Sequence, residues 1–73
     1  MQKNNNIEFI GCSMKFYMQR KKLSFPEVEE LTGISIRTLK RYADGETMPM
    51  LDKAVIISEC LGASINQIWR FER

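Results

Sequence analysis

Three cations on one stretch of predicted helix are the residues in this 73-residue chain best suited to chemistry. Arg37, Lys40 and Arg41 are spaced three and four positions apart, which puts them on one side of a helix. Arginine can bond O6 and N7 of guanine together through its planar fork, and both residue types bind phosphate. The same cations would suit an ordinary solvated helix face. The spacing favours a nucleic-acid contact surface and leaves the solvated face as the alternative.

The cations follow a first short helix that is predicted from capping signals. Ser24 lies three residues before Glu27, which is the spacing of a capping box, and Pro26 falls in the first turn. We therefore expect a helix from about residue 25 to residue 31, ended by Gly33.

Ser35 is the N-cap of the next predicted helix, which covers residues 36–44 and ends before Gly45. Two helices of this size, joined by a glycine turn, form a helix-turn-helix whose second member enters the DNA major groove. The cations lie on that second helix, so it is the predicted recognition helix.

The remaining segments are predicted to be helical scaffold. Apolar residues recur at three- and four-residue steps over residues 7–22, which predicts an amphipathic first helix. A fourth helix is expected over residues 50–61. Ser64, with Gln67 three positions later, predicts a capped fifth helix. The apolar residues expected in the core are Met14, Val28, Leu31, Leu39, Ala54, Ile57, Leu61 and Ile68.

Length and composition allow one domain. With 44% hydrophobic and 27% charged residues the chain is globular, and no segment alternates in the manner of a strand over a useful length. We expect a frayed tail over residues 1–6 and one domain over residues 7–73. The predicted fold is all-α, a compact five-helix bundle that contains the helix-turn-helix.

Several classes of function are excluded by what the sequence lacks. It has no histidine, and Cys12 and Cys60 lie far apart, so neither a metal site nor a catalytic set of nucleophile and base is expected. We expect reduced, partly buried cysteines, no cofactor and no enzymatic activity. No apolar run is long enough to span a membrane, which predicts a cytoplasmic protein. The net charge of +2 is a weak argument for a polyanionic partner.

The joint spacing of these signals resembles the Cro and phage-repressor class of helix-turn-helix domains, the XRE family, over residues 10–68. The residues that carry the resemblance are Ile10-Gly11, Met14-Lys15, Leu23-Ser24, Thr32-Gly33-Ile34-Ser35, Thr38-Leu39, Arg41-Tyr42, Gly45, Pro49, Ala54, Leu61-Gly62, Ser64-Ile65 and Ile68. Residues 31–42 are also similar to the MerR class, which continues into a β-wing, whereas helical spacing resumes here. The resemblance implies a sequence-specific double-stranded DNA-binding transcriptional regulator of bacterial, phage or mobile-element origin.

The resemblance also implies which residues contact DNA. By this resemblance, the residues that contact bases are Ile36, Arg37, Lys40 and Arg41. The residues that contact phosphate are Lys15, Ser24, Ser35, Thr38 and Thr47. Each has a plainer alternative: Ile36 packs beneath the preceding helix, the serines and Thr38 are caps, and Lys15 and Thr47 serve solubility.

Three positions depart from the family pattern. Phe25 stands where the family usually has a glutamine that contacts phosphate. Glu29 replaces a small residue, and we expect it to turn outward or to pair with Arg37 or Arg41. Met18 stands where an arginine often pairs with a glutamate.

These departures favour a rival function, a helix-turn-helix-shaped module that binds another regulator, such as an antirepressor. Its interface would include Phe25, Ile65, Trp69 and Phe71, of which the last three otherwise pack into the core. A homodimer through the C-terminal helix is a further expectation, because a lone domain makes few phosphate contacts.

Overall fold

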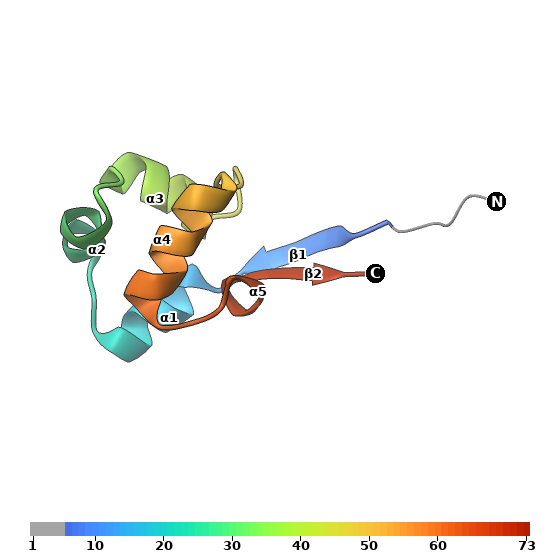
Figure 1. Ribbon diagram of the computed structural model, residues 1–73, viewed down its shortest axis with the longest axis horizontal. Helices are drawn as coiled ribbons and strands as arrows, with labels where there is room; N and C mark the ends of the chain where they lie inside the picture. Colours follow the sequence, from blue (N-terminus) through green and yellow to red (C-terminus); the bar gives the residue numbers. More distant parts are fainter. Residues whose placement is uncertain (1–5) are drawn as a thin grey trace.

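The computed structural model describes residues 6–73 and shows five helices together with a two-stranded antiparallel sheet (Figure 1). The fold is therefore mixed, and the expectation of an all-α bundle is wrong. Of the predicted tail, residues 1–5 lie outside the described residues.

The segment that we predicted as the first helix begins as a strand and only then becomes helical. Strand β1 covers Glu8–Cys12, and helix α1 covers only Met14–Lys21. The prediction was wrong because it relied on apolar residues at helical steps. The backbone of β1 instead forms its hydrogen bonds with a strand that is distant in the sequence. The change of element occurs at Ser13, whose backbone N–H donates to the carbonyl of Ile68 at 2.6 Å.

The C-terminal segment also differs from the prediction. Helix α5 is a single turn, Ile65–Ile68, with the predicted capping box between Ser64 and Gln67. The chain then continues as strand β2, Trp69–Glu72. A helix of four residues offers little surface for the homodimer that we expected there.

Strands β1 and β2 pair in an antiparallel register. The register shifts between Phe9 and Gly11, so Ile10 is the extra residue of a β-bulge. The paired positions are Glu8 with Glu72, Phe9 with Phe71, Gly11 with Arg70, and Cys12 with Trp69.

Helices α2 and α3 form the predicted helix-turn-helix. Helix α2 covers Phe25–Thr32 and ends at Gly33, whose φ of 77° is the left-handed conformation that glycine tolerates best. Helix α3 covers Ile36–Ala43. Their capping signals are visible in the sequence, so their positions were predicted closely.

Helix α4, Leu51–Leu61, closes the core against α2 and α5. Leu31, which we expected in the core because of its helical spacing, is 64% exposed. Val28 is the buried residue of helix α2, which packs against α3 and α4. The largest fully buried side chains are Trp69, Met14, Leu39, Ile57, Leu61, Ile68 and Val28.

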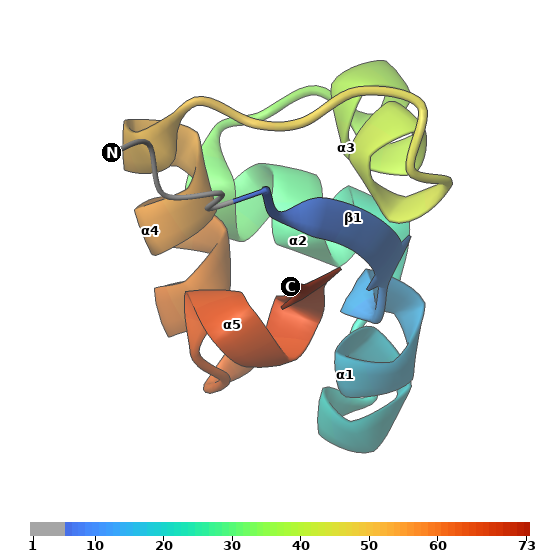
Figure 2. The same ribbon diagram turned by 90° about the vertical axis from the view of Figure 1, so that its right-hand side faces the viewer.

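The helices gather at one end of the molecule and the β1–β2 ribbon projects from them (Figure 1). Viewed along the ribbon, α3 lies at one side of β1, and α5 and α1 lie at the other (Figure 2). Phe9 joins the ribbon to the body, since a Cβ on Gly45 would lie 3.5 Å from its ring.

Candidate nucleic-acid interface

The exposed face of α3 carries the three predicted cations. Arg37, Lys40 and Arg41 are exposed, whereas Leu39 and Tyr42 on the opposite face are buried. The helix is therefore strongly amphipathic, and its packing against the core turns all three cations outward.

The cations are not neutralised by the acidic residues of α2. Within residues 6–73, Arg37 has neither an ion pair nor a hydrogen bond through its side chain. The Nε of Arg41 lies 3.6 Å from Oε1 of Glu46, and both side chains are more than half exposed, so the attraction is weak and screened by salt. Two guanidinium groups therefore remain available to a ligand.

The two lysines near α3 have other contacts. The Nζ of Lys40 lies 5.8 Å from the centre of the Phe25 ring, within the range of a cation–π interaction. The Nζ of Lys15 lies 3.1 Å from Oδ1 of Asp44, in an exposed ion pair. A phosphate at Lys15 would compete with that carboxylate.

We expected Glu29 either to turn outward or to pair with Arg37 or Arg41, and within residues 6–73 it forms no ion pair with either arginine. Its Oε2 accepts a hydrogen bond of 3.3 Å from the backbone N–H of Ile36, the first residue of α3. The carboxylate thus satisfies a free N–H at the positive end of the α3 dipole. It also places a negative charge where the predicted recognition helix begins.

The predicted phosphate-binding hydroxyls are mostly engaged as caps. The Ser24 hydroxyl accepts from the N–H of Glu27, while the N–H of Ser24 donates to the Glu27 carboxylate at 2.8 Å. The Ser35 hydroxyl accepts from the N–H of Thr38 and donates to its Oγ1 at 3.0 Å. Thr47 is half-buried, in the loop after α3.

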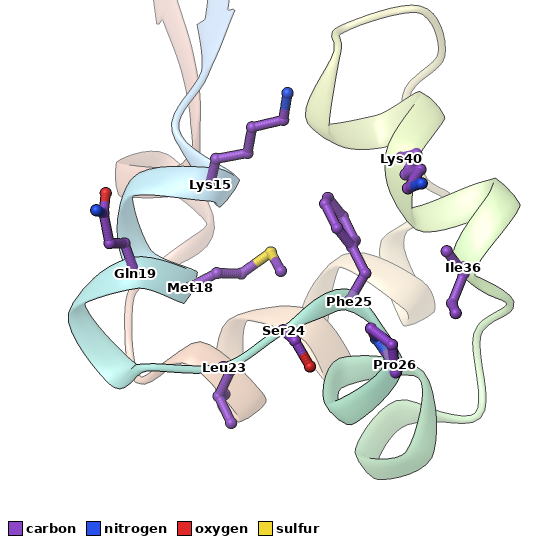
Figure 3. A pocket seen from close by; sticks show the side chains of 9 residues that line it. All are labelled: Lys15, Met18, Gln19, Leu23, Ser24, Phe25, Pro26, Ile36 and Lys40. Atoms are coloured by element: carbon purple, nitrogen blue, oxygen red, sulfur yellow. The ribbon is translucent and has the colours of Figure 1, made fainter.

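An apolar groove of about 540 Å³ lies beside this face, between α1 and the starts of α2 and α3 (Figure 3). The side chain of Phe25 projects into the groove from the start of α2, and Lys15 and Lys40 flank it (Figure 3). The groove is lined by Lys15, Met18, Gln19, Leu23, Ser24, Phe25, Pro26, Ile36 and Lys40.

Sequence reasoning missed this groove, although two signals pointed to it. Met18 and Phe25 are both departures from the family pattern, and both line it. Ile36 is half-buried and lines the same groove as Phe25. It therefore belongs to this surface, whether it contacts a base or packs beneath the preceding helix.

The C-terminal interface candidates separate by burial. Trp69 is 1% exposed and belongs to the core, so it offers no surface to a partner. Phe71 is 46% exposed on the ribbon, and its ring centre lies 5.5 Å from that of Phe9. Ile65 and Phe25 are half-buried.

Both cysteines are free and half-buried, as the sequence predicted. Burial raises the pKa of the Cys12 thiol and that of the Cys60 thiol. A raised pKa leaves less of the reactive thiolate at neutral pH, so neither thiol has the character of a nucleophile.

Comparison with known proteins adds no assignment: no protein-family model matches the chain, and no curated protein matches it. None of the helices found within residues 6–73 is long and apolar enough to cross a membrane.

Proposed function

We propose that this protein binds double-stranded DNA through the exposed face of α3, as a helix-turn-helix transcriptional regulator. It would act by occupying its site and excluding other proteins from it. The observation that carries the proposal is the outward-facing row of Arg37, Lys40 and Arg41, in which the Arg37 guanidinium has no partner within residues 6–73. Arg37 and Arg41 would bond guanine edges or phosphates, and the half-buried Ile36 would meet a thymine methyl group.

The decisive experiment is selection of bound oligonucleotides from a random duplex pool, followed by affinity measurements over a range of salt concentrations. The proposal expects an enriched motif, and an affinity that falls steeply as salt rises because phosphate contacts release counterions. It also expects the Arg37→Ala, Arg41→Ala double variant to lose most of this affinity.

A double variant of equal charge, Arg20→Ala with Lys53→Ala, is the matched control, because both side chains are exposed and lie outside α3. It should lose little affinity. Equal losses of DNA affinity in the two double variants would show that binding depends on net charge alone. The absence of any enriched motif would contradict the proposal.

The groove around Phe25 favours a second candidate function, a module that binds another protein. An apolar side chain of the partner would enter the groove, with an acidic group near Lys15 or Lys40. Phe25→Gln separates the two candidates. It restores the amide that the XRE family uses at this position, so DNA affinity should hold or rise, whereas a complex formed through the groove should weaken.

A further inference from the structure

The groove beside the start of α2 has the size and the lining of a small-molecule site. Its volume of 540 Å³ falls within the range of about 300–1,000 Å³ that is typical of ligand pockets. Its walls come from α1, from the link before α2, and from α2 and α3 themselves (Figure 3). Most of its lining is apolar, as in such pockets generally, and consists of Met18, Leu23, Phe25, Pro26 and Ile36.

The charged groups of the groove are all positive. Lys15 belongs to α1 and Lys40 to α3, so the two ammonium groups flank the groove from different helices (Figure 3). Within residues 6–73, none of the side chains that line the groove is acidic. The Nζ of Lys40 lies 5.8 Å from the centre of the Phe25 ring. An anionic group on a ring that stacks against Phe25 would therefore lie close to a cation.

We propose that the groove binds a small aromatic carboxylate and that the bound molecule excludes DNA from α3. The aromatic ring stacks on Phe25, and the carboxylate lies between Lys15 and Lys40. A rigid ring suits this groove better than a flexible chain, because it loses less rotational freedom on binding. The exclusion of DNA rests on the DNA-binding function proposed above, whereas the binding site itself does not.

An occupied groove removes side chains that the proposed DNA surface uses. Ile36 and Lys40 line the groove and also belong to α3, and Lys15 is one of the predicted phosphate contacts. A bound carboxylate neutralises the two lysines, so their attraction to phosphate is lost. The small molecule and DNA therefore compete for the same groups, and each lowers the affinity of the protein for the other.

Lys15 already has a carboxylate partner within the chain. Its Nζ lies 3.1 Å from Oδ1 of Asp44, and the two side chains are 64% and 48% exposed. An exposed ion pair of this kind contributes little free energy, so an incoming carboxylate can displace it. Asp44 thus acts as an internal competitor for the place where the carboxylate of a ligand meets Lys15.

The test uses 2-naphthoate as the probe, titrated into the full chain and followed by the NMR signals of the backbone amides. The signals of groove residues such as Met18, Phe25 and Ile36 should shift, whereas those of the β1–β2 ribbon should not. The amide 2-naphthamide has the same ring without the charge. It should bind roughly three- to tenfold more weakly at low salt, and this difference should shrink as salt rises.

Two pairs of variants test the assigned contacts. Asp44→Asn frees Lys15 and should strengthen 2-naphthoate binding roughly threefold, whereas the control Asp52→Asn removes the same charge from an exposed position outside the groove. Phe25→Ala should weaken the binding of both probes roughly tenfold. Its control, Phe16→Ala, removes a ring that is 54% exposed and lies outside the groove. Asp44→Asn leaves every lining side chain in place, so the test stands even if Phe25→Ala unfolds.

The competition is measured on the duplex that the selection experiment enriches. Saturation with 2-naphthoate should weaken DNA binding roughly tenfold, and the Asp44→Asn variant should reach this effect at a lower probe concentration than the Asp52→Asn variant. An unchanged DNA affinity with the groove occupied would refute the exclusion. A failure to enrich any duplex would count against the proposed function alone, because the NMR titrations need no DNA.

Three results would overturn the binding site. The first is the absence of shifts at the groove up to roughly 5 mM 2-naphthoate. The second is equal affinity for 2-naphthoate and 2-naphthamide, which would leave the groove to an apolar side chain of a partner protein. The third is an equal effect of Asp44→Asn and Asp52→Asn on the affinity for 2-naphthoate.

Discussion

The carboxylate of Glu29 and the backbone N–H of Ile36 meet at the start of α3, with 3.3 Å between Oε2 and N. Seven residues separate the two in the sequence, and the glycine turn brings them together. The contact stabilises the turn, but it sets a negative charge beside the surface that we propose for DNA.

We therefore expect Glu29→Gln to raise DNA affinity. The amide keeps an oxygen that can accept from Ile36, while the charge that repels phosphate is removed. The gain should be roughly three- to tenfold at low salt and should shrink as salt rises. Titration of labelled duplex measures it. Glu30→Gln, at an exposed position of α2 with no such contact, is the control, and an unchanged affinity in Glu29→Gln would contradict the expectation.

Two leucines should differ sharply in their effect on stability. Leu39 is fully buried and Leu31 is 64% exposed. Leu39→Ala should lower the free energy of unfolding by about 2–5 kcal/mol, and Leu31→Ala should change it by no more than about 0.5 kcal/mol. Urea denaturation followed by circular dichroism measures both. Similar losses in the two variants would show that Leu31 is covered in solution.

Trp69 combines full burial with an unsatisfied polar atom. Its Nε1 is buried and has no hydrogen-bond partner in the described part of the chain. Trp69→Phe removes that donor along with part of the ring, so the two effects oppose each other and the free energy of unfolding should change by no more than about 1 kcal/mol. Trp69→Ala, which mainly loses packing, should cost about 3–5 kcal/mol. Urea denaturation compares the two variants, and equal large losses would refute this account of the indole N–H.

The capping box of α2 predicts a loss of stability in acid. Hydrogen bonds from the backbone N–H and then from the hydroxyl of Ser24 lower the pKa of Glu27 below its ordinary value of 4.5. A carboxyl group whose pKa is lowered by folding stabilises the fold at every pH above its ordinary pKa. This stabilisation is lost as the pH falls through the folded-state pKa. Thermal unfolding between neutral and acidic pH should therefore show a smaller acid loss in Glu27→Gln than in the control Glu30→Gln. An equal loss of thermal stability with falling pH in the two variants would rule out a contribution from Glu27.

Local signals explain what the sequence predicted well. The serines at positions 24, 35 and 64 mark the starts of three helices, because each cap depends on neighbours within three residues. The outward direction of Arg37 and Arg41 also follows from local periodicity. These features need no knowledge of the rest of the fold.

The sheet and the groove depend on distant contacts. Strand β1 pairs with residues at the other end of the chain, and the bulge at Ile10 breaks the alternation that would have marked it as a strand. Strand β2 did carry a signal, since apolar Trp69 and Phe71 alternate with charged Arg70 and Glu72. The groove arises where three helices meet, so the unusual residues Met18 and Phe25 could be noticed in the sequence but their meeting in one groove could not.

The antiparallel ribbon joins a strand near the start of the described chain, β1, to the strand near its end, β2. Trimming β2 would leave Phe9 without Phe71 beside it and would uncover the core beneath Trp69. Because Phe9 rests against Gly45, just after α3, such damage would reach the loop that follows the predicted recognition helix. A tag or fusion attached to either extremity would thus act on the same ribbon, and through it on the segment that holds α3 in place.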